Sequence, residues 1–164
     1  MTLEHLATTL QTLQAAKIDF LIAGGLAVIA HGHSRVTHDL DLVIAMDDIN
    51  ISRAIECLTN LGFSPRLPVA AADFCDATIR KRWIEEKNLQ VFSMINESMG
   101  GLVIDLFAEE PFDFRSEYSK AALIALPGIE AHLPFVGKET LITMKRLANR
   151  SIDRDDIKHL TATE

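Results

Sequence analysis

The spacing of apolar residues along the chain changes from helical to alternating several times, and each spacing predicts an element. Over residues 3 to 16, leucines recur at intervals of three and four, which is the pattern of an amphipathic helix. A second helical pattern begins after Asp47 or Asp48, either of which suits an N-cap, and ends at Gly62. Both helices are predicted to pack one stripe against a core.

Alternating patterns predict strands in the second half of the chain. Residues 89–95 and 102–107 alternate on either side of the polar turn NESMGG, which indicates an antiparallel pair. Residues 123–126 and 131–136 are predicted to be two further strands, joined by Pro127 and Gly128. The sequence therefore mixes helices and strands throughout its length, which predicts an α/β (α+β) fold with a mixed sheet flanked by helices.

Two helices are predicted to end the chain, over residues 138–150 and 151–160. The first has an apolar face that includes Met144, Leu147 and Ala148, which leaves the basic residues mainly elsewhere on the helix. In the second, Ile157 and Leu160 are predicted to point inward. The three aspartates at 153, 155 and 156 are interpreted as helix-cap and surface charges.

Residues 19–45 combine a short apolar run with paired glycines. The run Phe20 to Ala23 is bounded by Gly24 and Gly25, which favours a buried strand followed by a tight turn. The apolar residues 26–30 then predict a two-turn helix that stops at Gly32. Backbone amides at a helix start favour anions, and glycines allow a phosphate to approach the backbone closely.

Asp39 and Asp41 follow in the segment DLDLVI, which alternates as a strand and so places both carboxylates on one face. Their Cα atoms lie roughly 6.5 Å apart in such a strand, so both side chains can converge on one cation or on a close pair of cations. Like charges about 5 Å apart repel by about 3 kcal/mol at an effective dielectric of about 20. A bound metal or a raised pKa is needed to offset this repulsion.

Asp105 is a charged residue inside the otherwise apolar strand LVIDLF, where it shares a face with Val103 and Phe107. A buried charge is costly unless it is paired or used. We weigh two interpretations: Asp105 is the third carboxylate of a metal site, or it is an edge-strand aspartate that faces water.

Length and composition favour one soluble domain spanning residues 1–164, of which 48% are hydrophobic and 24% charged. The two cysteines have no metal-ligand spacing, and no apolar run is long enough to cross a membrane, so a cytoplasmic location is expected. The net charge of −7 disfavours broad binding to nucleic acid. The most basic segment, residues 80–88 around Trp83, is either a solvated face with a buried tryptophan or a nucleotide-binding patch.

A glycine pair, thirteen residues, and then a D-x-D strand resembles the signature of the polymerase-β-type nucleotidyltransferases. Further segments narrow the resemblance to the AbiEii toxin-like group, namely LIAGGLAVIAHG, RVTHDLDLVI, RWIEEKNLQVFS, VIDLF with EEPFDF, and KETLITMKRLANRSIDRDDIKHL. The resemblance covers most of the chain. It implies the nucleotidyltransferase fold with C-terminal helices, and transfer of a nucleoside monophosphate from an NTP with release of pyrophosphate.

The resemblance also implies roles for individual residues. Three aspartates would hold two Mg²⁺ ions and carry catalysis, namely Asp39, Asp41 and Asp105, with Asp105 also helping to deprotonate the accepting hydroxyl. Gly24 and Gly25 would contact the triphosphate, and Lys145 is a further candidate because the similar helix in relatives presents a basic residue there. By position alone, Arg35 and Thr37 lie just before the D-x-D strand, within reach of phosphate or ribose, and a surface role is the alternative for Arg35. One departure is that the second glycine position is often serine in the family, where the hydroxyl can add a phosphate contact.

The acceptor remains open between an RNA end, a protein hydroxyl and a small hydroxylated molecule. The acidic chain favours a cationic small molecule or a protein, whereas the toxin-like resemblance implies RNA or protein acceptors and a cognate antitoxin. The alternative function is a catalytically inactive nucleotide-binding or regulatory module of the same fold. The three mutually repelling aspartates argue against it, because such a module could lose them and gain stability.

Overall fold

The computed structural model describes residues 2–126, 128–129 and 131–162. Within these residues the chain forms seven α-helices and seven strands. The helices are α1 Leu3–Ala15, α2 Gly24–Ala30, α3 Asp48–Asn60, α4 Ala77–Lys87, α5 Phe114–Ser119, α6 Lys138–Ala148 and α7 Ser151–Ala162. The strands are β1 Phe20–Ile22, β2 Asp39–Ile44, β3 Ser64–Pro65, β4 Val91–Asn96, β5 Leu102–Phe107, β6 Ala122–Ala125 and β7 His132–Phe135. Two short 3-10 helices, η1 Ala71–Cys75 and η2 Glu97–Met99, precede α4 and β5.

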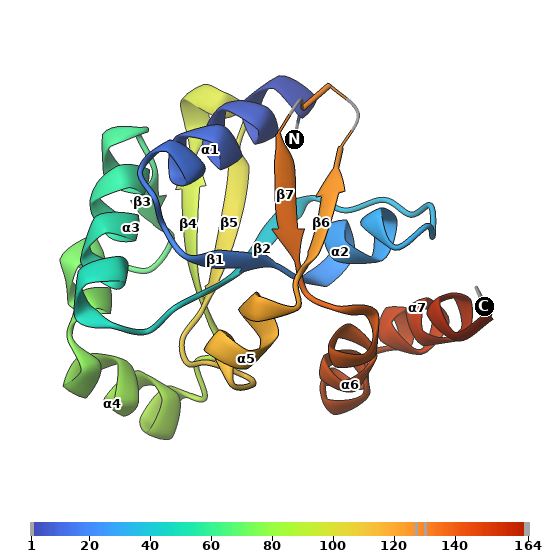
Figure 1. The fold of residues 1–164 in the computed structure, drawn as a ribbon. Coiled ribbons are helices and arrows are strands. Elements are labelled where there is room, and N and C mark those ends of the chain that lie inside the picture. The colour runs from blue at the N-terminus through green and yellow to red at the C-terminus, as the bar shows by residue number, and fades with distance from the viewer. Residues whose placement is uncertain (1, 127, 130, 163–164) are drawn as a thin grey trace.

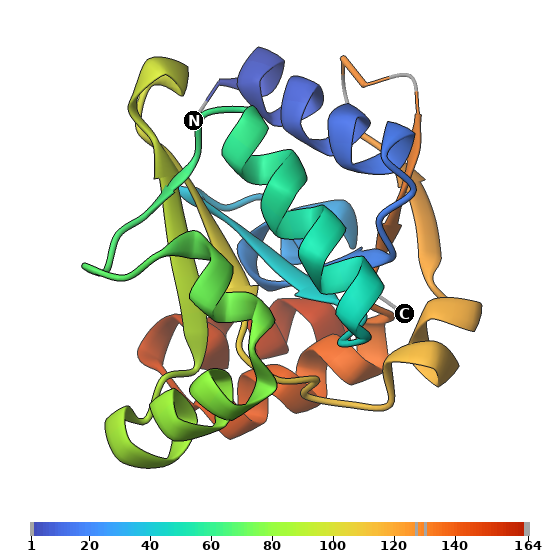
Figure 2. The same ribbon diagram turned by 90° about the vertical axis from the view of Figure 1, so that its left-hand side faces the viewer.

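All seven strands belong to one mixed sheet in the order β3-β4-β5-β2-β1-β7-β6. The pairs β2–β5 and β1–β7 are parallel, and the other pairs are antiparallel. Helices α1 and α3 cover one face of the sheet, while α2, α6 and α7 lie on the other (Figures 1 and 2). The predicted α/β fold with flanking helices and C-terminal helices is confirmed.

The two faces of the central strands differ in burial. In β4 and β5 every second residue is fully buried, among them Phe92, Met94 and Ile104, and these residues pack beneath α1, α3 and η1. The intervening residues are only half-buried. The sheet therefore has one sealed face that contributes the core and one face that is partly open, toward α2 and α6.

The expected strand and helix boundaries agree closely with the structure in the central segment. β2 covers Asp39–Ile44, and β4 and β5 pair antiparallel as predicted. Helix α2 begins at Gly24 itself, so the glycines form the first turn of the helix and not a separate turn before it. The β6–β7 pair is present, although Pro127 of its predicted connection lies outside the described residues.

The predicted faces of α6 and α7 are wrong in part. Leu147 was assigned to the packed face of α6 but is 80% exposed, whereas Lys145 is 4% exposed. On α7, Asp153 and Asp156 were interpreted as cap and surface charges but are fully buried. The reason is that Lys145 forms ion pairs with both aspartates, at 3.3 and 2.7 Å, so the contact between the two helices is partly ionic.

Two further features were not predicted. The sheet gains an edge strand, β3, from a proline-containing segment in which the apolar pattern predicts no strand. In the basic segment of α4, Trp83 is buried as one interpretation expected, but Arg80 is buried as well and donates a hydrogen bond to the carbonyl of Phe74. None of the helices in the described part of the chain is long and apolar enough to cross a bilayer.

Candidate active site

The parallel pairing of β2 with β5 brings the predicted acidic residues together. In the register, Asp41 lies directly opposite Asp105, and Asp39 lies two residues before Asp41 on the same strand face. All three belong to the partly open face of the sheet and are half-buried. Of the two interpretations of Asp105, an aspartate on an outer strand is excluded, because β5 lies between β4 and β2.

Gly24 fits against the side chain of Asp41 so closely that no other residue has room there. A Cβ atom added at Gly24 would lie 1.7 Å from Oδ2 of Asp41, and the φ of Gly24 is +58°. Only glycine tolerates both conditions without strain. Since Gly24 opens α2, the carboxylate of Asp41 lies at the amino-terminal end of that helix, where the backbone N–H of Gly25 donates a hydrogen bond to it.

The environment of Asp41 and Asp105 favours the protonated forms of these two aspartates. Burial, followed by the charge of Asp105, raises the pKa of Asp41 to about 6, although the N–H of Gly25 acts in the opposite direction. Burial also raises the pKa of Asp105, and the charge of Asp39 adds to this, against the hydrogen bond that Ser93 donates to Asp105 at 2.5 Å. Neighbouring carboxylates that must be ionised together need a compensating cation.

These residues fit a site for Mg²⁺. The candidate ligands are hard carboxylate oxygens, which Mg²⁺ prefers. Among the described residues no lysine, arginine or histidine forms an ion pair with any of the three aspartates. Arg150 and Arg66 act on Asp41 and Asp105 only as more distant charges. The position that a cation would take is therefore not filled by a side chain of the described chain.

Two of the predicted nucleotide contacts, Arg35 and Thr37, lie on the loop between α2 and β2 and pack over Gly25. A Cβ atom at Gly25 would lie 2.5 Å from Oγ1 of Thr37 and 3.2 Å from Cζ of Arg35. The hydroxyl of Thr37 thus occupies the space that the side chain of a serine at position 25 would take. The guanidinium of Arg35 is held by an ion pair of 2.7 Å with Asp156 of α7.

Lys145, the remaining predicted nucleotide contact, does not lie with the other residues. It is enclosed between α6 and α7, where its ammonium group forms ion pairs with Asp153 and Asp156. Sequence reasoning did not single out Arg150, which lines a cavity together with Asp41. Asp153 holds the guanidinium of Arg150 through two hydrogen bonds, at 2.8 and 3.2 Å. The sequence signal was a basic residue at the end of the predicted helix 138–150. That segment contains four basic residues, namely Lys138, Lys145, Arg146 and Arg150, and their spacing gives no means of choosing among them.

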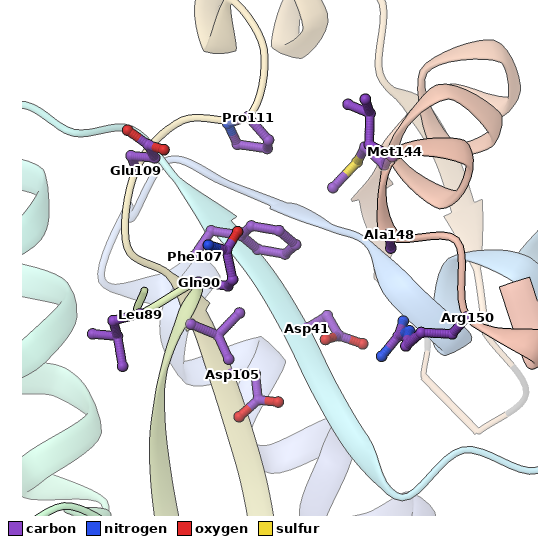
Figure 3. A pocket seen from close by; sticks show the side chains of 12 residues that line it. Asp41, Leu89, Gln90, Asp105, Phe107, Glu109, Pro111, Met144, Ala148 and Arg150 are labelled. Atoms are coloured by element: carbon purple, nitrogen blue, oxygen red, sulfur yellow. The ribbon is translucent and has the colours of Figure 1, made fainter. Parts of the chain in front are cut away.

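A cavity of about 560 Å³ opens beside the acids, between the sheet and α6. Asp41 and Asp105 lie at one end, and Glu109 and Pro111 lie at the other (Figure 3). Most of the remaining wall is apolar and comes from the ends of β4 and β5 and from α6, and it includes Leu89, Val91, Phe107, Met144 and Leu147. The site therefore joins an acidic end to a largely apolar chamber.

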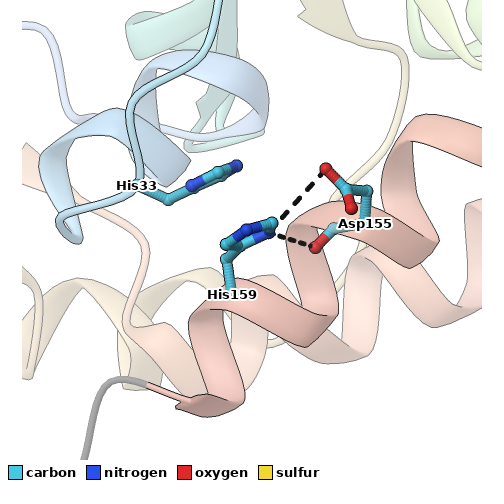
Figure 4. A group of neighbouring side chains, drawn as sticks. All are labelled: His33, Asp155 and His159. Atoms are coloured by element: carbon cyan, nitrogen blue, oxygen red, sulfur yellow. Dashed lines mark hydrogen bonds and ion pairs between the residues drawn. The ribbon is translucent and has the colours of Figure 1, made fainter.

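Histidines fasten the loop that carries Arg35 to α7. The ring of His33 stacks on that of His159 with centroids 3.7 Å apart, and the ligand atoms of His33, Asp155 and His159 lie within 4.8 Å of one another (Figure 4). The two rings are nearly parallel, with an interplanar angle of 9°. Lone pairs in parallel ring planes do not converge on one point, so this arrangement suits a packing contact better than a metal site.

Comparison with known proteins gives structural neighbours only. No family model matches the chain, and no curated protein matches its sequence. Among solved structures, the lincomycin-bound lincosamide antibiotic adenylyltransferase LnuA aligns with a TM-score of 0.66 and 16% identity, over 100% of this chain and 99% of LnuA. ANT(2'')-Ia in complex with adenylyl-2''-tobramycin aligns with a TM-score of 0.64 and 14% identity, over 99% of this chain and 90% of that one.

A third neighbour, an antigenic nucleotidyltransferase-like protein from Paracoccidioides brasiliensis, has a TM-score of 0.54 and 20% identity, over 98% of this chain and 77% of its own. The three alignments cover almost the whole of this chain. Identities of this size relate folds and not activities. The chain has the fold of the nucleotidyltransferases.

Proposed function

We propose that the protein is a Mg²⁺-dependent nucleotidyltransferase that moves a nucleoside monophosphate from an NTP to a hydroxyl group. The observation that carries the proposal is the set of three half-buried aspartates on one sheet face, beside a helix that opens with two glycines. Burial raises the pKa of two of them, at a cost in stability that a purely structural role does not explain. The neighbours LnuA and ANT(2'')-Ia support the same reaction class through their fold.

In this reaction the acceptor oxygen forms a bond to the α-phosphorus of the NTP, and the bond from that phosphorus to the pyrophosphate oxygen breaks. The electron pair of the broken bond leaves with pyrophosphate. The proton of the acceptor hydroxyl passes to a carboxylate and then to solvent. Asp105 is suited to receive it because burial raises its pKa, so that it holds a proton more readily than an ordinary aspartate.

Asp39, Asp41 and Asp105 would hold the two Mg²⁺ ions that we propose. When bound, such ions neutralise charge on the phosphates and lower the pKa of an accepting hydroxyl. On the other side of the acids, the N-terminal amides of α2, the hydroxyl of Thr37 and the guanidinium of Arg35 are assigned to the phosphates that leave. Arg150, which lies beside Asp41 and is held by Asp153, is assigned to the nucleotide in place of Lys145.

The acceptor and the biological role are the finer part of the proposal. LnuA was solved with lincomycin bound and ANT(2'')-Ia in complex with adenylyl-2''-tobramycin, which supports a small hydroxylated molecule as the acceptor. The resemblance of the sequence to AbiEii-type toxins adds an RNA end or a protein hydroxyl as acceptors, a cytoplasmic location and a cognate antitoxin protein as partner. We favour the small molecule, because the negative charge of the cavity opposes a polyanionic RNA.

The test is to incubate the purified protein with each α-³²P-labelled NTP, Mg²⁺ and three acceptor pools: cell RNA, cell protein and cell metabolites. Label is expected to enter one of the three pools, and unlabelled pyrophosphate is expected to be released at the same time. Asp41→Asn is expected to lower the rate by about 1,000-fold or more, equivalent to about 4 kcal/mol of transition-state stabilisation.

The matched control for this variant is Asp155→Asn, which changes an exposed aspartate on α7 and should leave the rate unchanged. Full activity in Asp41→Asn would refute the assignment of the acids. Tight Mg²⁺-dependent NTP binding without labelling of any pool would instead favour the inactive nucleotide-binding module.

A further inference from the structure

Apolar side chains are left partly uncovered next to the candidate catalytic acids. Val91 and Phe107 are half-buried on the open sheet face, and they lie opposite one another in the β4–β5 register. Across the cavity, Leu147 of α6 is 80% exposed. Exposed apolar surface gathered in a cavity of about 560 Å³ is the usual character of a pocket that binds a small organic molecule.

The direction of the reaction assigns this pocket to the acceptor. The glycine-opened helix meets the sheet near the start of β2, where Ala23 pairs with Asp41. The cavity extends the other way, from Asp105 past Phe107 to Glu109 beyond the end of β5. An in-line displacement at phosphorus requires the attacking and leaving oxygens on opposite sides. If pyrophosphate leaves toward the glycines, the accepting hydroxyl must approach from the cavity.

Charge in the cavity is unevenly distributed. At the end far from the acids lies Glu109, whose side chain is exposed and forms no ion pair with another described residue. Its neighbour Glu110 is engaged, because it accepts a hydrogen bond of 2.9 Å from the backbone N–H of Met46. The cationic side chain in the wall, Arg150, lies at the end with Asp41 (Figure 3). The far end therefore offers a single carboxylate for a single positive charge.

We infer that the acceptor is a small amphipathic alcohol that carries one protonated amine. Its ammonium group pairs with Glu109, its apolar body lies along Val91, Phe107 and Leu147, and its hydroxyl reaches Asp105. This inference rests on the proposed function, since it names the acceptor of that same site. A polycationic acceptor would need several carboxylates beyond the proposed catalytic ones, and of the described residues in the wall Glu109 alone supplies one. An RNA acceptor would place phosphates beside Glu109 and gain nothing from the apolar wall.

Three matched probes separate these contributions in the metal-free protein. N-octyl-D-glucamine carries hydroxyls, one amine and an apolar chain; N-octanoyl-N-methyl-D-glucamine keeps the chain but is neutral; N-methyl-D-glucamine keeps the amine but lacks the chain. Each is titrated below its micelle concentration, and dissociation constants are taken from the ¹³C-methyl signals of Met144 and Leu147. We expect the octyl amine to bind about tenfold more tightly than either of the other two probes.

Variants then assign the contacts. Glu109→Gln should weaken the octyl amine about tenfold and leave the octanoyl amide unchanged, while the control Glu110→Gln should change neither. Leu147→Ala, followed through Met144, should weaken both octyl probes several-fold. Its control is Leu123→Ala on β6, which alters a leucine that is 65% exposed elsewhere.

The inference is overturned if the octyl amine causes no shifts at these methyl groups. It is also overturned if Glu109→Gln weakens the amine and the amide equally, or if N-methyl-D-glucamine binds as tightly as the octyl amine. Failure of the proposed function has a different signature. Binding of adenosine 5′-(α,β-methylene)triphosphate would then be independent of Mg²⁺ and unchanged by Asp41→Asn, whatever the amine probes show.

Discussion

Two clusters of aspartates lie on the same side of the sheet, and the protein treats them in opposite ways. In the first, Asp41 and Asp105 have no ion-pair partner among the described residues, and their pKa values are raised. In the second, Asp153 and Asp156 are fully buried but are paired with Lys145, with Arg150 on Asp153 and Arg35 on Asp156. Burial alone would raise the pKa of Asp153, yet hydrogen bonds from Arg150 lower it below its usual range.

The difference indicates that the two clusters have different roles. The second cluster is complete, because its negative charges are balanced by cations from the chain, and it joins α6, α7 and the loop that carries Arg35. The first cluster is incomplete in charge and gains stability from any cation that binds there. The two are coupled, because Arg150, which lines the cavity with Asp41, and Arg35, which packs over Gly25, form ion pairs with the aspartates of the second cluster. Four experiments can break or sharpen this comparison.

The largest effect is expected from Lys145→Met. It leaves Asp153 and Asp156 buried with a major counter-charge removed, which should lower the free energy of unfolding by about 3–5 kcal/mol. Urea denaturation followed by circular dichroism measures it. Arg146→Met is the control, since Arg146 is exposed on the same helix and its loss should matter by less than about 0.5 kcal/mol. Equal effects of the two variants would mean that the buried cluster does not stabilise the fold.

Next in size is the expected effect of Mg²⁺ on the first cluster, for which we propose metal binding. At one hundred times its dissociation constant, Mg²⁺ should raise the free energy of unfolding by about 2.7 kcal/mol at pH 8. At pH 5.5 the gain should be smaller, because the pKa of Asp41 is about 6 and protons then compete with the ion. Urea midpoints with Mg²⁺ or with EDTA at matched ionic strength give the answer. An identical gain at both pH values would place the ion elsewhere.

Asp41→Asn and Asp153→Asn should have opposite signs. The pKa of Asp41 is 3.8 in the unfolded chain and about 6 in the folded one, so the folded state binds the proton more tightly. The free energy of unfolding of the wild type therefore decreases as the pH rises from about 4 to about 6. Without metal, Asn at 41 should therefore stabilise the protein by about 2–3 kcal/mol at pH 8 and by almost nothing at pH 3.5. The pKa of Asp153 is lowered, so its charge contributes stability at neutral pH that is lost on acidification, and Asp153→Asn should destabilise. Two changes of the same sign at pH 8 would contradict the comparison.

The smallest effect concerns the loop that connects the two clusters. Gly25→Ser should destabilise by about 1 kcal/mol, because its Cβ would lie 2.5 Å from the hydroxyl oxygen of Thr37. Thr37→Ala makes room for that side chain, so the double variant should recover most of the loss. A double-mutant cycle in urea measures the coupling. Strict additivity of the two changes in unfolding free energy would show that Thr37 does not occupy the space that a serine side chain at position 25 needs.

Sequence reasoning succeeded where the signal is local. Alternation within DLDLVI and LVIDLF fixes which residues share a face, so the strands and the common side of Asp39 and Asp41 could be predicted from a few neighbouring residues. The glycine pair was recognised for the same reason. The adjacency of Asp41 and Asp105 needed the pairing of β2 with β5, which joins segments more than sixty residues apart. The resemblance to a known family supplied that pairing, and local pattern did not.

Sequence reasoning failed where the surroundings of a residue are supplied by another helix or strand. On α6 the pattern assigned Leu147 to the interior and Lys145 to the outside, because apolar residues are usually buried. The carboxylates of α7 reverse this preference for Lys145, and the cavity reverses it for Leu147. Arg150 was missed for a similar reason, since its place beside Asp41 depends on how α6 ends above the sheet. None of these contacts is visible in the spacing of residues along one helix.

The contact between Gly24 and Asp41 has a consequence for how the sequence can change. Any side chain at position 24 collides with the carboxylate at position 41, and the substitutions at 41 that would make room are smaller ones that remove the carboxylate to which we assign metal binding. The two positions are therefore locked to each other, and no single replacement at either one leads to another working pair. A random library built at position 24 should return glycine alone among active clones, however mild the selection.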